Sequence, residues 1–170
     1  MIFWQWEQMV GLKQPPKSQD RRPKFPYELA RQLWKHGWSY LVDLKYNPVT
    51  DSALAEANRI LAENVITLSV CPPGRGKKAV GRTPPIKAIR RELLVGISNY
   101  DCLKEGIFRR NDYARDLQGF SHLGSQDVFT TPKYAFLDLW NSIYRKPHSW
   151  QDSPRVWVLE FECLKSPPSA

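Results

Sequence analysis

The sequence predicts a single α+β domain, with flanking helices arranged around a mixed β-barrel. Segments rich in β-branched residues alternate with short amphipathic segments, and glycine and proline mark the loops between them. The chain then closes with a long apolar strand pattern. At 170 residues it has the usual length of one domain, and it shows neither an internal repeat nor a dividing linker.

The N-terminal third is predicted to hold a basic loop and two helices. Residues 11–26 are rich in proline and positive charge, and proline disfavours regular helix, so we expect a loop there. Apolar residues at helical spacing predict a helix from Glu28 to Trp38. A second helix is expected to start at a cap formed by Asp51 or Ser52 and to run to about residue 63.

The middle of the chain is predicted to hold three strands and a short helix. The run 65–70 is β-branched and ends at a Pro-Pro-Gly turn. Shorter strand patterns cover 79–83 and 86–94. Ser98 is a capping residue for a helix that Gly106 ends.

The C-terminal part is predicted to hold a loop and a helix. Periodicity fades over 109–130, and glycines suggest that this region is an exposed loop. Thr131-Pro132 then opens a helix with proline at its first position. The apolar stripe of this helix consists of Ala135, Phe136, Leu139, Trp140 and Ile143.

The last predicted strand, 155–164, is apolar on both faces for much of its length, so it should be central and covered. Trp157 and Phe161 are expected on one face, packed against the helix that carries Phe136 and Trp140. Residues 166–170 read as a frayed tail.

The charge of the chain favours a polyanionic partner. Its formal net charge is +8 with a pI near 9.5, and Lys and Arg attract phosphates by releasing condensed counterions. A solvated basic surface is the alternative, but the cations cluster, which favours binding. The clusters contain Lys13, Lys17, Arg21, Arg22 and Lys24; Arg75, Lys77, Lys78 and Arg82; and Lys87, Arg90 and Arg91.

Several classes of protein and site are not supported. No apolar run approaches the roughly 18 residues of a membrane helix, and the N-terminus does not read as a signal peptide. Cys71, Cys102 and Cys163 lie far apart and the histidines are scattered, so we expect free thiols in the cytoplasm and no metal site. The loop 74–78 lacks the Walker spacing, and no cofactor is predicted. That loop is either a flexible hairpin tip or, as we prefer, a phosphate contact.

Three segments, in the same order, resemble the ASCH family, small relatives of the PUA RNA-binding barrels. The segment 17–23, Lys-Ser-Gln-Asp-Arg-Arg-Pro, is similar to the family's N-terminal signature, with Asp20 where the family usually has threonine. The segments 74–82 and 89–92 are similar to a bacterial and phage branch, which suggests a phage-related role. The third segment consists of residues 97–107, which resemble the family's helix that ends in glutamate-glycine, together with the C-terminal helix and strand. The strand pattern alone does not close a barrel, but the resemblance implies a PUA-like one.

The resemblance also implies a site. In the ASCH family, the signature lysine and the helix-end glutamate line one cleft. Some members hydrolyse the amide of N4-acetylcytidine with a lysine, a threonine and a glutamate. By position the group here is Lys17, Asp20 and Glu105. A lysine with a lowered pKa can act as a base or stabilise an oxyanion, and a carboxylate can relay a proton. Asp20 lacks the hydroxyl and would favour the charged ammonium of Lys17, which weakens the case for this chemistry.

Ordinary structural roles are the alternatives at these positions. A lysine in a proline-rich basic loop, such as Lys17, is more often solvated than catalytic. Glu105 can be an ordinary surface glutamate at a helix end, where it opposes the dipole. Trp140, Trp150 and Trp157 are expected in the core, although an exposed tryptophan can stack on a base.

The leading hypothesis is an RNA- or nucleotide-binding module, with a base in the cleft and phosphates on the basic loops. The alternatives are an amidohydrolase of modified nucleosides and, less favoured, a metal-dependent ribonuclease, for which no acidic cluster is seen. The predicted nucleic-acid contacts are Arg21, Arg22, Arg75, Lys77, Lys78, Arg82, Arg90 and Arg91.

Overall fold

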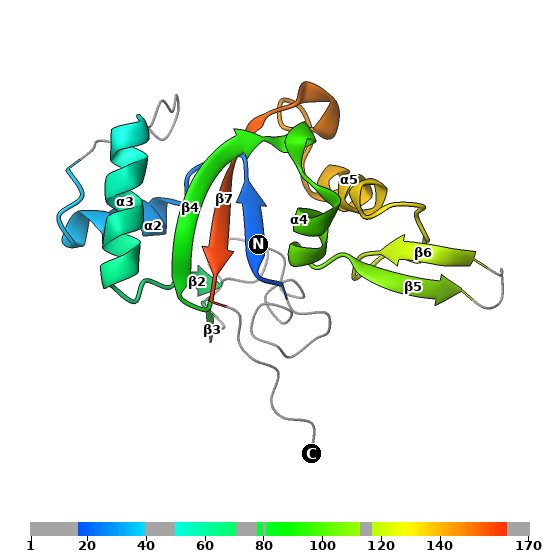
Figure 1. Cartoon of the computed structure of the whole chain (residues 1–170), viewed down its shortest axis with the longest axis horizontal. Coiled ribbons are helices and arrows are strands. Elements are labelled where there is room, and N and C mark those ends of the chain that lie inside the picture. The colour runs from blue at the N-terminus through cyan, green and yellow to red at the C-terminus, as the bar shows by residue number, and fades with distance from the viewer. Residues whose placement is uncertain (1–16, 40–49, 71–77, 80, 113–116, 163–170) are drawn as a thin grey trace, which may run out of the picture.

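The computed structural model describes residues 17–39, 50–70, 78–79, 81–112 and 117–162 (Figure 1). These residues form an α+β structure, as predicted, and every strand pair is antiparallel. The strands belong to one three-stranded and two two-stranded sheets, and none of these closes into a barrel within the described residues. No helix in these ranges is long and apolar enough to cross a membrane.

The central sheet has the strand order β1-β7-β4. β7 (Arg155–Phe161) lies between β1 (Gln19–Arg22) and β4 (Ile86–Leu93), so the closing strand is central, as predicted. β1 corrects the prediction of a loop over 11–26. Its sequence, Gln-Asp-Arg-Arg, has no apolar alternation, and its backbone becomes a strand by pairing with β7 from Gln19↔Glu160 to Arg22↔Trp157.

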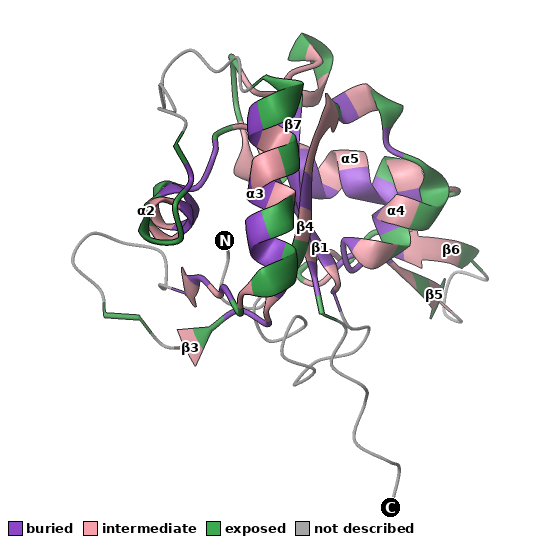
Figure 2. Ribbon diagram, turned by 60° about the vertical axis from the view of Figure 1, so that its left-hand side comes forward, coloured by how far each residue is buried: buried purple, intermediate pink, exposed green. Residues whose placement is uncertain are grey.

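α2 (Tyr27–Lys35) and α3 (Asp51–Glu63) cover one face of this sheet (Figures 1 and 2). Both helices agree with the prediction, but the cap of α3 is Thr50, whose hydroxyl accepts a hydrogen bond from the Ala53 N–H. Their apolar faces join those of β4 and β7 in a single core. That core includes Phe25, Leu29, Leu33, Ile60, Ile89, Trp157, Leu159 and Phe161.

α4 (Asn99–Lys104) and α5 (Pro132–Ile143) form a second core on the other side of the sheet. Ser98 caps α4 and Thr131 caps α5, as the sequence predicts. The expected packing of Trp157 and Phe161 on α5 is wrong, because both belong to the core beneath α2 and α3. The β7 residue in the α5 core is Val156, since successive strand side chains point to opposite faces.

β5 (Phe108–Asp112) and β6 (Leu117–Ser121) form a hairpin that extends away from the central sheet (Figure 1). This hairpin corrects the prediction of a loop over 109–130. Its signal is weak because Arg, Asn, Asp, Gln and Gly occupy many of its positions. Gly119 permits the hairpin to lie against Phe129, since a Cβ at this position would collide with the Phe129 carbonyl.

The remaining elements are short. β2 (Ser69–Val70) pairs with β3 (Gly81–Arg82), so the strands expected at 65–70 and 79–83 are present in shortened form. Single 3-10 turns precede α4 and β7, at Leu94–Gly96 and Trp150–Asp152.

Candidate functional site

Lys17, Asp20 and Glu105 come together although Glu105 lies far from the other two in the chain. The Lys17 Nζ lies 3.1 Å from Asp20 Oδ1 and 3.1 Å from Glu105 Oε2. Backbone structure holds this geometry: the Ser18 N–H donates to the Lys104 carbonyl at 2.9 Å, which ties the end of α4 to the start of β1. All three side chains are buried, so the interpretations of Lys17 as a solvated lysine and Glu105 as a surface glutamate are wrong.

The charge state of Lys17 decides what it can do. Burial by itself would lower the Lys17 pKa, but attraction to Glu105 and Asp20 outweighs it and raises the pKa above its ordinary value. Lys17 is therefore an ammonium at neutral pH and donates hydrogen bonds. This agrees with the expectation that Asp20 favours the charged form of Lys17. A role for Lys17 as a base is disfavoured, and a role as a donor to a developing negative charge is retained.

Asp20 is held between two cations. Its Oδ1 accepts from Lys17, and its Oδ2 accepts from Arg22 Nε at 2.6 Å. Burial opposes ionisation, but Lys17 and Arg22 override it, so the Asp20 pKa lies below its ordinary value of 3.8. Asp20 is thus a fixed carboxylate, which accepts hydrogen bonds and orients Lys17.

Arg21 has a different role from the one predicted. Its side chain is fully buried; Nη1 lies 2.6 Å from Glu105 Oε1, and Nε donates to Glu92 Oε1 at 2.8 Å. Because these carboxylates already neutralise it, Arg21 does not reach a phosphate at the surface. Arg21 positions Glu105 instead. The pairing of β1 with β7 explains this role, and the sequence motif does not indicate it.

A small pocket of about 40 Å³ opens beside these groups. One side of its lining is charged, and the other comes from the apolar face of α5 and the residue after it. Three aromatic residues repeat at a spacing of four along this wall: Phe136, Trp140 and Tyr144. Trp140 and Tyr144 have ring centroids 4.3 Å apart. Tyr144 is not among the predicted site residues. Its helical spacing from Phe136 and Trp140 is the feature of the sequence that could have identified it.

Tyr144 contributes a neutral hydroxyl to the pocket. Burial raises its pKa to about 12, with the Asp20 carboxylate adding to the shift. Such a hydroxyl both donates and accepts hydrogen bonds at neutral pH. It makes no hydrogen bond to another side chain among the described residues, so it is available to a ligand.

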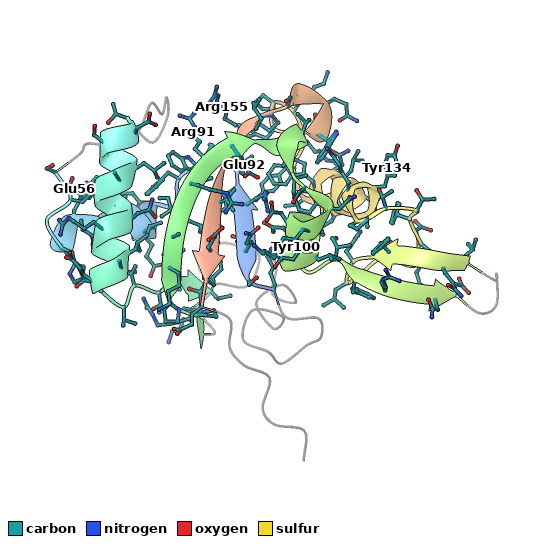
Figure 3. The ribbon with its side chains drawn as sticks, viewed as in Figure 1. Glu56, Arg91, Glu92, Tyr100, Tyr134 and Arg155 are labelled. Carbon is teal, nitrogen blue, oxygen red and sulfur yellow. The ribbon has the colours of Figure 1, made fainter. Side chains whose placement is uncertain are left out.

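The remaining predicted nucleic-acid contacts are dispersed over the molecule. Lys78 and Arg82 are exposed near β3, and Arg82 also bonds to the Thr67 carbonyl and hydroxyl. Arg90 pairs with carboxylates on β4, β7 and α4, which reduces its free charge. Arg91 lies over the Trp157 ring near Arg155, at one end of the sheet (Figure 3). Arg75 and Lys77 lie outside the described residues.

Other chemistries receive little support in the described ranges. No group of His, Cys, Asp and Glu residues there could hold a metal ion. Cys102 is buried, and burial raises its pKa to about 12, so its thiol is not an activated nucleophile. Cys71 and Cys163 lie outside the described residues.

Two of the three predicted catalytic positions thus meet directly through the Lys17–Glu105 ion pair, and the third, Asp20, completes the group. The geometry offers fixed donors, fixed acceptors and an aromatic wall at one pocket. Comparison of the chain with protein-family models, with curated proteins and with solved structures gives no match.

Proposed function

We propose that this chain is an RNA- or nucleotide-binding protein whose pocket at Lys17, Asp20 and Glu105 receives the polar edge of a base. The observation that carries the proposal is the convergence of these buried charges at a pocket walled by aromatic rings. Buried ionic groups are costly, so their concentration at a cavity favours a binding role over a purely structural one.

The chemistry of the pocket complements a nucleobase. Base edges present hydrogen-bond donors and acceptors side by side. Lys17 and Arg22 offer donors, and Asp20 and Glu105 offer acceptors, at fixed positions. The rings of Trp140 and Tyr144 offer π surfaces, and base–aromatic stacking contributes about 1–3 kcal/mol per base.

The ASCH assignment and its PUA-like barrel are part of this proposal. The residues that resemble the family signature, Lys17 and Glu105, share one pocket, which is the arrangement that the resemblance implies. The sheet β1-β7-β4 and the pair β2-β3 would be parts of such a barrel.

The base pocket is tested by titrating the protein with nucleosides, cytidine and N4-acetylcytidine included, and with short RNA. The indole N–H of Trp140, which donates to the His148 carbonyl, is a local NMR reporter. Glu105→Gln keeps the shape of the side chain but removes an acceptor charge, so affinity should fall by about tenfold. Glu63→Gln, on the exposed side of α3, is the matched control and should bind like the parent. If no nucleoside or RNA shifts the Trp140 signal, the base pocket is misassigned.

The basic surface is tested by the salt dependence of RNA affinity. Removing one cation that binds a phosphate should reduce the steepness of log affinity against log salt by about 1. We expect Lys77→Ala/Lys78→Ala to lower both the affinity and this steepness. An affinity indifferent to salt, or unchanged in this double variant, removes residues 74–78 from the proposed interface.

The Lys17–Glu105 contact also favours a second candidate, hydrolysis of an amide on a modified base. Asp20 would orient a water, and Glu105 would take a proton from this water as its oxygen attacks the amide carbon. The Lys17 ammonium would stabilise the oxyanion, and Glu105 would pass that proton to the amine as the C–N bond breaks, which releases the amine and a carboxylic acid. Asp20 lacks the hydroxyl of the family's threonine, so we expect weak or absent cytidine release from N4-acetylcytidine. Robust release by the parent, abolished in Glu105→Gln, would establish the enzyme instead. Release gained only in Asp20→Thr would show a binding pocket that resembles the enzyme's.

A further inference from the structure

A larger cavity of about 350 Å³ adjoins the base pocket and shares Arg22 and Tyr144 with it. We propose that this outer cavity is a phosphate subsite, so that the ligand is a nucleotide or an RNA strand and not a free nucleoside. This inference rests on the proposed function, because the base is taken to enter the smaller pocket. It adds the phosphate as the second recognised group and assigns it to Arg22, Lys24 and His148.

The sizes of the two cavities favour this division. A volume of about 40 Å³ has room for a few water molecules, so the inner pocket admits the edge of a base and not a whole nucleoside. The outer cavity has the volume of a small-molecule site, for which about 300–1,000 Å³ is typical. A ligand whose base edge enters beside Lys17 must therefore pass Arg22 and Tyr144, and its sugar and phosphate occupy the outer cavity.

Basic side chains line the outer cavity. Arg22, Lys24 and His148 line it, and no carboxylate of the described residues does. Arg22 uses its Nε–H to bond Asp20, which fixes the guanidinium, while its side chain remains 24% exposed. Its terminal nitrogens make no hydrogen bond to a described residue, and a guanidinium with free terminal N–H groups binds phosphate in a bidentate way.

Both loops that line the outer cavity are held in place. Phe25 is buried between Trp38 and Trp157, with its ring centroid 4.9 Å from that of Trp157, so the segment beside Lys24 is anchored in the core. On the other side, the His148 carbonyl accepts from the Trp140 indole at 2.7 Å. Such anchoring reduces the conformational entropy lost on binding.

The nearest acidic residue in the second loop does not neutralise the site. Asp152 accepts from the Ser149 N–H and hydroxyl within its own turn. Lys24 forms no ion pair with a described carboxylate, and it is exposed. Lys24 and the terminal nitrogens of Arg22 are therefore available to an anion.

The test compares calorimetric affinities of cytidine, its 5′- and 3′-monophosphates and a trinucleotide at one salt concentration. We expect a monophosphate or the trinucleotide to bind about tenfold more tightly than the nucleoside. Lys24→Ala/His148→Gln should abolish that preference, because it removes two of the groups assigned to the phosphate and keeps the residues of the base pocket. The control Lys35→Ala/His36→Gln makes the same chemical changes at exposed residues at the end of α2 and should retain the preference.

The outcomes separate the two proposals. Equal affinity of the parent for nucleoside and phosphorylated ligands overturns the subsite and leaves the base pocket standing. If the Lys24/His148 variant keeps the phosphate preference, these residues do not bind the phosphate, and the subsite is overturned. If the control also loses the preference, overall charge explains it, and the subsite is overturned as well. If none of the ligands binds, both proposals fail. Preference for the trinucleotide alone, lost in the Lys24/His148 variant, identifies the phosphate as one in an RNA backbone.

Discussion

Different interactions stabilise the two faces of the β1-β7-β4 sheet. One face places Trp157, Leu159 and Phe161 in an apolar core beneath α2 and α3. The other face carries a polar network that ends at Glu105. That network joins Gln19, Arg21, Arg90, Glu92 and Glu160.

The two faces contribute differently to the stability of the fold and to the positioning of the site residues. Apolar burial is non-directional and stabilises the fold in proportion to the area removed from water. Buried ion pairs lose hydration, and their net contribution is small, but removal of one partner leaves an uncompensated charge. We therefore expect the apolar face to dominate the free energy of unfolding, and the polar face to govern the geometry at Lys17 and Glu105.

The largest effect is expected for Trp157→Ala. Replacing a buried tryptophan by alanine leaves a cavity in the α2/α3 core and should lower the free energy of unfolding by about 3–5 kcal/mol. Urea denaturation measures it, with exposed Tyr134→Ala as the control. A loss below about 1 kcal/mol would show that β7 is not central to the core.

Glu105→Gln should have an intermediate effect on stability. The amide can still accept hydrogen bonds, but Lys17 and Arg21 lose their shared countercharge, so we expect a loss of about 1–3 kcal/mol. The same denaturation experiment, with Glu63→Gln alongside, separates the buried site from an exposed carboxylate. Identical stability in both variants would contradict a coupled network at the pocket.

Acid should destabilise the protein through Asp20. Its folded pKa lies below the ordinary 3.8, so its contribution is fully present well above pH 3.8. The contribution is lost as the pH falls below that value toward the folded pKa, because the unfolded state then binds the proton more readily. Asp20→Asn should be less stable than the parent at pH 7, and the difference should shrink as the pH falls. A difference that stays constant over the acid range would mean that Asp20 contributes through packing alone.

The smallest effect is expected for Arg59→Ala. Arg59 and Glu63 form an exposed pair on α3 with 58% and 57% of their side chains accessible, and such pairs contribute about 0.3–0.5 kcal/mol. Thermal unfolding at low and high salt measures it. A loss as large as that of Glu105→Gln would remove the contrast between buried and exposed pairs.

Local sequence signals identified the helices and most of their ends. Thr131-Pro132, Ser98 and Gly106 act through bonds within a few residues, so α4 and α5 were predictable. β1 and the β5–β6 hairpin were missed because their residues are polar and their backbone hydrogen bonds go to strands that local periodicity does not reveal. The same limit explains the wrong face assigned to Trp157: alternation shows which residues share a face, but not which helix covers it.

The candidate site divides in the same way. The caps, the basic charge, the central apolar strand and, through resemblance, the pairing of Lys17 with Glu105 could all be predicted from the residues. The effect of Asp20 on the charge of Lys17 was also predictable. The folded arrangement was needed to show that Glu105 adds to this effect, that Arg21 is buried, and that Tyr144 lines the pocket. The physical reason is that burial, ion pairing and pKa depend on distances between segments far apart in the chain, which no local pattern encodes.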